Sequence, residues 1–278
     1  MSSAPTSDSI EFDHIAIGVP DDAEVARYLE RALGGRPCDA GPGKGFRWWQ
    51  WEYRCGERLE VLRPDGPPGG FLHRFLDRRG AGLHHVTFKV PNLDRSVERA
   101  GDLGFEVLGF DDSDPFWKEA FLHPKQAGGM VVQLAQVHAR PQPSLRTLSV
   151  KGHSAELEGM GNPAAIVGLR SSARDLDEAR RLWSELLEGR ERSASPARFP
   201  AGCEGMRPGN PGDDDTGERE TIFEWPSSPM RIALSIDPEL PEGPLGIEIA
   251  GGVSQGAPAG HSEIYPALGV RFIRSGPE

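Results

Sequence analysis

The sequence has few of the features that mark membrane, nucleic-acid-binding or disulfide-stabilised proteins. It contains no run of about 18 apolar residues, the length that a membrane-spanning helix needs. Its 31 Lys and Arg residues are outnumbered by 42 Asp and Glu residues, for a formal net charge of −11. This balance argues against a nucleic-acid partner, which requires a basic face. Only three cysteines occur, and their spacing is not metal-like, so we expect ordinary small residues in a reduced, cytoplasmic protein.

Turn-forming residues, by contrast, are abundant. The 278 residues include 35 Gly and 25 Pro, which predicts many turns and short elements rather than a helical bundle. The length suits one large domain or two smaller ones. Residues 1–9 are small and polar and lack the basic and apolar regions of a signal peptide.

An internal repeat organises the first half. The segment His14–Asp21 (HIAIGVPD) reappears as His85–Asn92 (HVTFKVPN), 71 residues later. Both copies are rich in apolar and β-branched residues, which predicts a strand. Both end in Pro followed by Asp or Asn, so Asp21 and Asn92 are predicted helix N-caps.

Apolar stripes predict a helix after each copy, and further strands follow. The stripes are Val25, Tyr28, Leu29, Ala32 and Leu33 in the first copy, and Leu93, Val97 and Ala100 in the second. The further strands are Phe46–Tyr53, Arg58–Leu62, Trp117–Leu122 and Gly129–Ala135. Each unit therefore has the order βαβββ or nearly so.

The second half repeats this pattern more weakly. A third copy begins at Ala165–Ser172, continues with a helix over Leu176–Leu187 and ends at Arg231–Leu234. Parts of a fourth are Leu245–Ile249 and Leu268–Ile273, without a convincing helix between them. We predict an α+β fold of two modules, each of paired βαβββ units, at residues 10–138 and 162–278. Residues 139–161 are the predicted linker, and 193–220 a surface loop or a lid.

Polar residues recur at equivalent positions of the first two units. A lone histidine in an apolar strand is usually a hydrogen-bonded core residue, but His14 and His85 occupy the same position of a repeat. Glu60 and Gln133 are equivalent in the same way. If the units pack symmetrically, these four side chains converge on one point. Two imidazoles and two side-chain oxygens suit one divalent transition ion with positions left open for substrate.

Three segments resemble the vicinal oxygen chelate (glyoxalase/bleomycin resistance/dioxygenase) superfamily. They are Phe12–Ile17, Gly82–Val86 and Phe121–Val132, and the last, which contains Phe-Leu-His-Pro-Lys and Gly-Gly, is the most specific. Within the superfamily the first half looks like the methylmalonyl-CoA epimerases. The resemblance covers about residues 10–137 and implies paired βαβββ units that form a cup around a metal. Carried over, its ligand positions fall on His14, Glu60, His85 and Gln133.

The chain also departs from the epimerase pattern. That pattern places Gln on the last strand of the first unit and Glu, which is both ligand and base, on the second, whereas here the order is reversed. Its second base corresponds to Trp48, with Gln50 and Glu52 on the same face. We therefore assign Glu60 as ligand and base, and Glu52 as a second candidate base. Trp48, Gln50, His123 and Lys125 are expected to contact substrate, with Lys125 facing a CoA phosphate or a carboxylate.

Neither His84 nor the corresponding positions of the second module are expected to bind a metal. His84 should point to the opposite face of the sheet by strand alternation. In the second module Ala165 replaces the first histidine, Ala233 the carboxylate and Gly246 the second histidine. We therefore expect that module to hold no metal.

Three functions follow from these features. The first is a metal-dependent isomerase, epimerase or lyase that moves a proton next to a carbonyl, with Co, Ni, Zn, Mn or Fe as the ion. The second is a non-haem iron dioxygenase, because His14, His85 and Glu60 form a two-histidine, one-carboxylate set. The third is a non-enzymatic binding or resistance protein that uses Trp48, Trp49 and Trp51, one face of which is plain core. The expected substrate is a small molecule with vicinal oxygens, such as an acyl-CoA or another carboxylate, and the protein is a monomer or homodimer.

Overall fold

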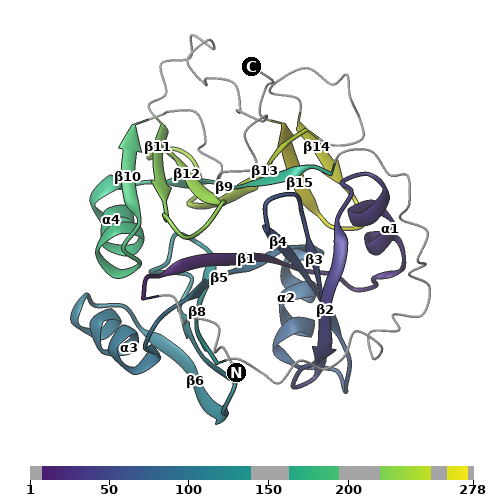
Figure 1. Cartoon of the computed structure of the whole chain (residues 1–278), viewed down its shortest axis with the longest axis horizontal. Helices are drawn as coiled ribbons and strands as arrows, with labels where there is room; N and C mark the ends of the chain where they lie inside the picture. Colours follow the sequence, from purple (N-terminus) through teal and green to yellow (C-terminus); the bar gives the residue numbers. More distant parts are fainter. Residues whose placement is uncertain (1–7, 139–162, 194–219, 252–261, 275–278) are drawn as a thin grey trace, which may run out of the picture.

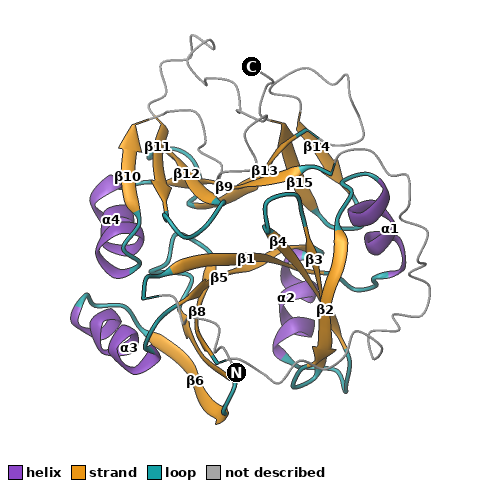
Figure 2. Cartoon of the chain, viewed as in Figure 1, coloured by secondary structure: helices purple, strands orange, loops and turns teal. Residues whose placement is uncertain are grey.

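The computed structural model describes residues 8–138, 163–193, 220–251 and 262–274. Within these ranges the chain forms two mixed β-sheets with few helices, one sheet from each half of the chain (Figures 1 and 2). The predicted α+β class is therefore confirmed. The predicted linker 139–161 and almost all of the loop 193–220 lie outside the described residues, so the domain limits stay a prediction.

The first sheet contains two units related by an approximate twofold axis between its central strands. Its strand order is β2 (Arg36–Pro42), β3 (Phe46–Glu52), β4 (Arg58–Pro64), β1 (Glu11–Gly18), β5 (Gly82–Lys89), β8 (Val131–Val137), β7 (Trp117–Leu122) and β6 (Val107–Asp114). Strand β1 pairs in parallel with β4, and β5 in parallel with β8, whereas β1 and β5 are antiparallel. This is the predicted pairing of two βαβββ units.

Helices follow both copies of the repeated strand. Helix α1 (Ala23–Arg31) buries Val25 and Leu29, as its apolar stripe predicts. Its N-cap is Asp22 rather than the predicted Asp21, and Asp22 makes no side-chain cap bond because its carboxylate accepts a bond from Arg63. Helix α3 (Leu93–Asp102) has the predicted cap, since the side chain of Asn92 accepts a bond from the Arg95 backbone N–H.

Three elements of the first half have no counterpart in the sequence prediction. Strands β2 and β6 lie at the two edges of the sheet and bury none of their residues, so they lack a hydrophobic pattern. Helix α2 (Phe71–Arg79) buries only Leu72. Phe75 of α2 packs closely over Gly18, where a Cβ atom would lie 3.0 Å from the Phe75 ring.

The second sheet repeats this topology with one strand fewer among the described residues. Its order is β10 (Arg190–Ser193), β11 (Glu220–Glu224), β12 (Arg231–Ile236), β9 (Ala165–Ala173), β13 (Gly243–Ala250), β15 (Val270–Arg274) and β14 (Ser262–Tyr265). The predicted helix of the third unit is α4 (Leu176–Arg180), which continues as a π-helix over Arg181–Leu186. Most of the stretch between β13 and β14, where no helix is predicted, lies outside the described residues.

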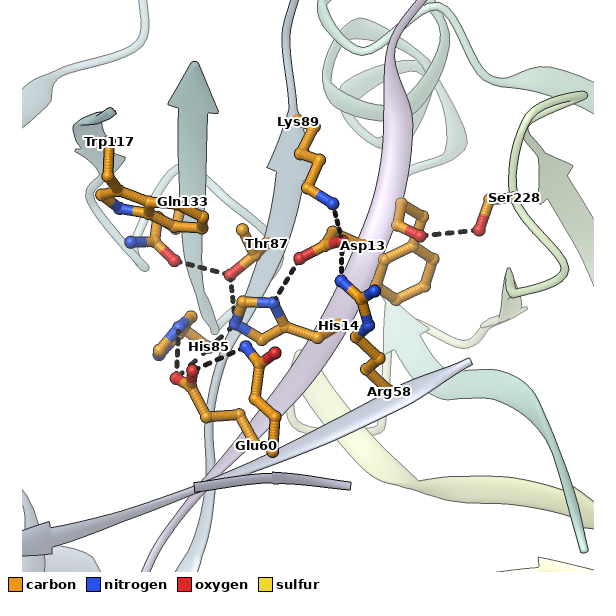
Figure 3. Close-up of polar contacts among 12 residues, drawn as sticks. Asp13, His14, Arg58, Glu60, His85, Thr87, Lys89, Trp117, Gln133 and Ser228 are labelled. Atoms are coloured by element: carbon orange, nitrogen blue, oxygen red, sulfur yellow. Dashed lines mark hydrogen bonds and ion pairs between the residues drawn. The ribbon is translucent and has the colours of Figure 1, made fainter. Parts of the chain in front are cut away.

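One hydrophobic core joins the two halves. The Phe88 ring of β5 lies 4.7 Å from that of Trp225 and 6.0 Å from that of Trp183. The Ser228 hydroxyl donates a 2.6 Å hydrogen bond to the backbone carbonyl of Phe12 in β1 (Figure 3). Figure 1 shows the two sheets beside each other. Arg99 of α3 donates a hydrogen bond to Glu188, which follows the π-helix of the second half. The halves are therefore packed as one body.

The face of the first sheet that points away from this core forms a cup. Ile15 and Ile17 of β1 belong to the shared core, whereas the alternate residues, His14 and Ala16, point to the other face. The sheet curls so far that its two edges come into contact. Lys44, in the loop after β2, forms an ion pair with Asp111 on the opposite edge strand, β6. We call this concave face the cup; its floor carries His14, Gln50, Glu60, His85, Thr87, Glu119 and Gln133.

Two expectations from composition have separate outcomes. No helix in the described ranges is long and apolar enough to cross a membrane. Cys38 is a free thiol, but Cys55, in the turn after β3, is disulfide-bonded. The prediction that every cysteine is an ordinary small residue is therefore wrong for Cys55.

Candidate metal centre

Four strands bring the predicted ligand residues to one place on the cup floor. His14 lies on β1, Glu60 on β4, His85 on β5 and Gln133 on β8. Ala16 pairs with both Glu60 and His85, and Thr87 pairs with both His14 and Gln133. The antiparallel pairing of β1 with β5 therefore places the two candidate ligands of the first unit next to those of the second. The repeat in the sequence becomes a convergence in space.

The donor atoms lie close enough to share an ion. His14 Nε2 is 3.6 Å and His85 Nε2 3.9 Å from Glu60 Oε1 (Figure 3). One ligand atom from each of these three residues lies within 4.8 Å of the other two. Gln133 joins them through Thr87, whose hydroxyl donates a 2.6 Å bond to Gln133 Oε1 and lies 2.9 Å from His14 Nε2.

The chemistry of this set fits a metal ion. His85 Nε2 is buried and has no hydrogen-bond partner in the described structure, an arrangement that costs free energy unless another group satisfies it. Burial, with the nearby His84 and His14, holds the pKa of His85 well below its ordinary value, so the ring is neutral and keeps a lone pair for an ion. Glu60 supplies charge beside it and is itself only 8% exposed.

A second layer of residues orients His14. Asp13 Oδ2 lies 2.7 Å from His14 Nδ1, and Asp13 also forms ion pairs with Arg58 and Lys89 (Figure 3). Burial alone would raise the pKa of Asp13, but the His14 hydrogen bond and the Lys89 charge lower it below its ordinary value. Burial alone would lower the pKa of His14, but Glu60 and Asp13 raise it to about 9. A carboxylate at Nδ1 directs Nε2 toward the site.

Hydrogen bonds from neighbouring strands hold the two last-strand residues, Glu60 and Gln133. Gln50 Nε2 donates a 2.9 Å bond to Glu60 Oε2, and Gln133 Nε2 donates a 2.7 Å bond to Glu119 Oε2. Gln50 was predicted to contact substrate, and the structure places it against Glu60. Thr87, Asp13 and Glu119 were missed, because only the strand register shows that they face the same point.

Asp13→Asn should weaken binding of a divalent ion about 10- to 100-fold, the usual effect of removing an outer-shell carboxylate. The amide keeps the shape of the side chain but loses the negative charge beside His14. Titration calorimetry with Co²⁺ measures the change, and Asp77→Asn on the exposed face of α2 is the matched control. An affinity equal to that of the control would show that Asp13 supports only the fold.

Three residues predicted as bases or substrate contacts make their contacts outside the four-residue set. Glu52, the candidate base, forms an ion pair with Arg36 toward one end of the cup. Trp48 faces the cup but packs with Leu62 and helix α2. Lys125 lines a separate cavity of about 200 Å³ formed with residues of the second half, among them Ser171 and Trp183.

His123 and His84 complete the list of predicted residues. His123 Nδ1 accepts a 3.2 Å bond from the Lys125 backbone N–H, within the loop that follows β7. The prediction that His84 points to the opposite face is wrong. A register shift between β1 and β5 leaves His84 opposite no partner, so its Nδ1 lies 2.8 Å from His85 Nδ1 and its ring packs on Phe75. Strand alternation fails at such a bulge.

Comparisons with known proteins agree with this geometry. Residues 13–121 match the sequence model of a family described as "Glyoxalase/Bleomycin resistance protein/Dioxygenase superfamily". The mitochondrial methylmalonyl-CoA epimerase of Homo sapiens is 30% identical over 133 residues, 45% of this chain and 72% of that protein. The ethylmalonyl-CoA/methylmalonyl-CoA epimerase of Cereibacter sphaeroides is 32% identical over 132 residues, 45% of this chain and 96% of that protein. The chain belongs to the glyoxalase superfamily.

A structural similarity extends over both halves of this glyoxalase-superfamily protein. A 4-hydroxymandelate synthase mutant from Streptomyces coelicolor covers 87% of this chain with a TM-score of 0.56, and 71% of that chain is matched. The sequence identity is 12%, so the likeness shows the fold alone. The two-module fold that the sequence predicts is shared with this solved structure.

The second sheet of this glyoxalase-superfamily protein carries different residues at the positions equivalent to the ligands. Gly168 pairs with Arg231 and Glu248 as His14 pairs with Arg58 and Thr87. Gly168 therefore occupies the His14 position, and the predicted equivalence of Ala165 is wrong by three residues, because two apolar runs align equally well at either offset. The same register places Ala233, Gly246 and Ile273 at the other three positions. None of these four side chains offers a metal ligand.

A buried ion pair lies opposite Gly168 on the second sheet. Arg231 Nη2 lies 3.0 Å from Glu248 Oε1, and neither side chain is more than 4% exposed. Arg231→Met should therefore lower the free energy of unfolding by about 3 kcal/mol, since it leaves a buried carboxylate poorly paired. Denaturant unfolding measures the loss. The double variant Arg231→Met/Glu248→Leu should recover most of it, and failure to recover would show that the loss comes from packing rather than charge.

Proposed function

We propose that this protein is a metal-dependent enzyme that moves a proton next to a carbonyl, as an isomerase or epimerase does. The observation that carries the proposal is the carboxylate of Glu60, which lies among two imidazoles on a buried cup floor. A chain related to epimerases and built with this donor set has the parts for that chemistry. The reaction needs an acid–base group close to a centre that stabilises negative charge.

The residues divide this work between them. His14, His85, Glu60 and Gln133 would hold one divalent ion. Such an ion supplies electrophilic stabilisation of the enolate that forms when a proton leaves the carbon next to a carbonyl. Glu60 takes up that proton, and Gln50, bonded to Glu60 Oε2, leaves Oε1 directed at the histidines. Asp13 fixes the His14 ring, so that the floor is rigid before substrate arrives.

The substrate class follows from the same chemistry. An ion with open positions binds two neighbouring oxygens, as in an acyl thioester that bears a carboxylate. The relatives act, by their names, on methylmalonyl-CoA and ethylmalonyl-CoA. We propose a small acyl-CoA or a related carboxylate as the substrate of this chain.

Metal analysis and solvent exchange test the proposal together. The protein, purified without chelators, is assayed for Co, Ni, Zn, Mn and Fe, and then incubated in D₂O with methylmalonyl-CoA and other short acyl thioesters. Deuterium at the carbon next to the carbonyl, dependent on bound metal, is the expected result. Stoichiometric iron with oxygen uptake and no exchange would replace the proposal with the dioxygenase alternative.

The non-enzymatic binding alternative has less support. Trp51 is a core residue, and Trp49 packs partly against the same core. Only Trp48 of the three tryptophans faces the cup, where it is covered by α2. The tryptophans therefore do not form a joint surface for an aromatic ligand. We propose that the second half serves as a structural partner for the first.

A further inference from the structure

A second carboxylate faces the cup at a position that the twofold relation between the units defines. Trp48 on β3 pairs with the residue two positions after Glu60 on β4. Glu119 on β7 pairs with the residue two positions after Gln133 on β8. Trp48 and Glu119 are therefore equivalent positions of the two units. The unit that supplies the carboxylate ligand has an indole there, and the unit that supplies the amide ligand has a carboxylate.

The contacts of Glu119 hold it in place without neutralising it. Its Oε2 accepts bonds of 2.7 Å from Gln133 Nε2 and 2.8 Å from Trp117 Nε1. Its Oε1 has no hydrogen bond, and the side chain no ion pair, in the described part of the structure. The residue is half-buried, and Oε1 is not a buried atom, so this oxygen is accessible. A carboxylate fixed through one oxygen presents the other to a ligand.

Two other carboxylates near the cup are already engaged in ion pairs. Glu52 is paired with Arg36, and Asp111 with Lys44. Glu119 is also linked directly to a candidate ligand, Gln133, which neither of the others is. Of these three described carboxylates, Glu119 is the one that contacts a candidate ligand and carries no ion pair.

Glu60 and Glu119 lie on opposite sides of the site. In the strand order, β4 with Glu60 lies on one side of the central β1–β5 pair, and β7 with Glu119 lies on the other, beyond β8. A planar enolate held between them would present one face to each carboxylate. Inverting a carbon requires two such groups, since a proton must leave one face and return to the other.

We propose that Glu119 is the second proton-transfer residue and that the reaction is an epimerisation next to a carbonyl, a step that rests on the proposed function. One carboxylate takes the proton, and the electrons of the C–H bond move into the enolate. The other, in its acid form, returns a proton to the opposite face, where the enolate electrons form the new C–H bond. No oxidant or reductant is needed. The indole at Trp48 makes the cup asymmetric, with the free carboxylate on the second unit.

Glu119→Gln tests the inference, because glutamine keeps an acceptor for Gln133 and Trp117 but cannot carry the proton. A single epimer of methylmalonyl-CoA and the other acyl thioesters are followed in D₂O by NMR. Wild-type protein should form both epimers with deuterium. Glu119→Gln should interconvert them at least 100-fold more slowly, within the range for a lost acid–base group, yet still exchange the proton of one epimer. Glu98→Gln on the exposed face of α3 is the matched control.

A metal-binding measurement separates proton transfer from a positioning role. Glu119→Gln should bind Co²⁺ within threefold of the wild-type affinity by calorimetry. A large loss of affinity would show that Glu119 only orients Gln133 and would overturn the inference, as would interconversion at more than a third of the wild-type rate. If wild-type protein exchanges no proton in any thioester tested, the proposed function fails and the inference fails with it.

Discussion

Replacing His14 and His85 together with alanine should leave a folded protein that retains no divalent ion. Each histidine contributes one of the two ring nitrogens that face Glu60 at 3.6 and 3.9 Å. Loss of an outer-shell partner alone weakens metal binding about 10- to 100-fold, so loss of two ligands should exceed about 100-fold. Elemental analysis after gel filtration measures the retained metal.

The fold should survive this double substitution because neither ring belongs to the shared core. His123→Ala is the matched control, since His123 lies outside the group of candidate ligands and its ring accepts a bond from the Lys125 backbone, and it should retain metal at the wild-type level. Equal metal content in the double variant and the wild type would show that the ion binds elsewhere.

Glu60→Gln should give the largest loss of proton transfer. It removes the one carboxylate of the four-residue set while keeping its shape and its bond to Gln50. Loss of a positioned acid–base group lowers a rate about 10²- to 10⁴-fold. The rate of deuterium incorporation into an acyl thioester substrate measures the effect, with the protein saturated with metal so that weaker binding does not contribute.

The exchange of the two last-strand residues provides a stringent companion experiment. Glu60→Gln/Gln133→Glu moves the carboxylate across the twofold axis without changing the charge or the number of ligands. We expect it to transfer protons poorly, since the carboxylate at position 133 would lie against that of Glu119, which accepts a hydrogen bond from Gln133 in the native protein. Full activity in this variant would contradict the assignment of Glu60 as the base.

Much of the site was predictable because the repeat has a simple physical meaning. His14 and His85 share one position in two packed units, so their convergence follows from symmetry, and Glu60 and Gln133 follow in the same way. The apolar stripe of α1 was equally predictable, because Val25 and Leu29 are buried one turn apart. Patterns that depend on burial of one face are recorded in the sequence.

Other features depend on register, which a single sequence does not record. The bulge at His84 turns its ring to the side of the sheet opposite to the one that alternation predicts. The equivalence of Gly168 with His14 needs the pairing of β9 with its neighbours. In the sequence, Glu119 cannot be told from an ordinary polar residue of an outer strand. Only the pairing of β7 with β8 shows that it lies beside Gln133. Strands β2 and β6 lack a hydrophobic pattern because edge strands bury little.

The central claim is that His14, Glu60, His85 and Gln133 bind a single divalent ion. Anomalous diffraction from crystals grown with Co²⁺ tests it most directly. The account predicts one strong peak in each molecule within bonding distance of His14 Nε2, His85 Nε2 and a Glu60 oxygen, on the floor of the cup. A protein that binds no Co²⁺, or a peak at any other group of residues with this site empty, would contradict it.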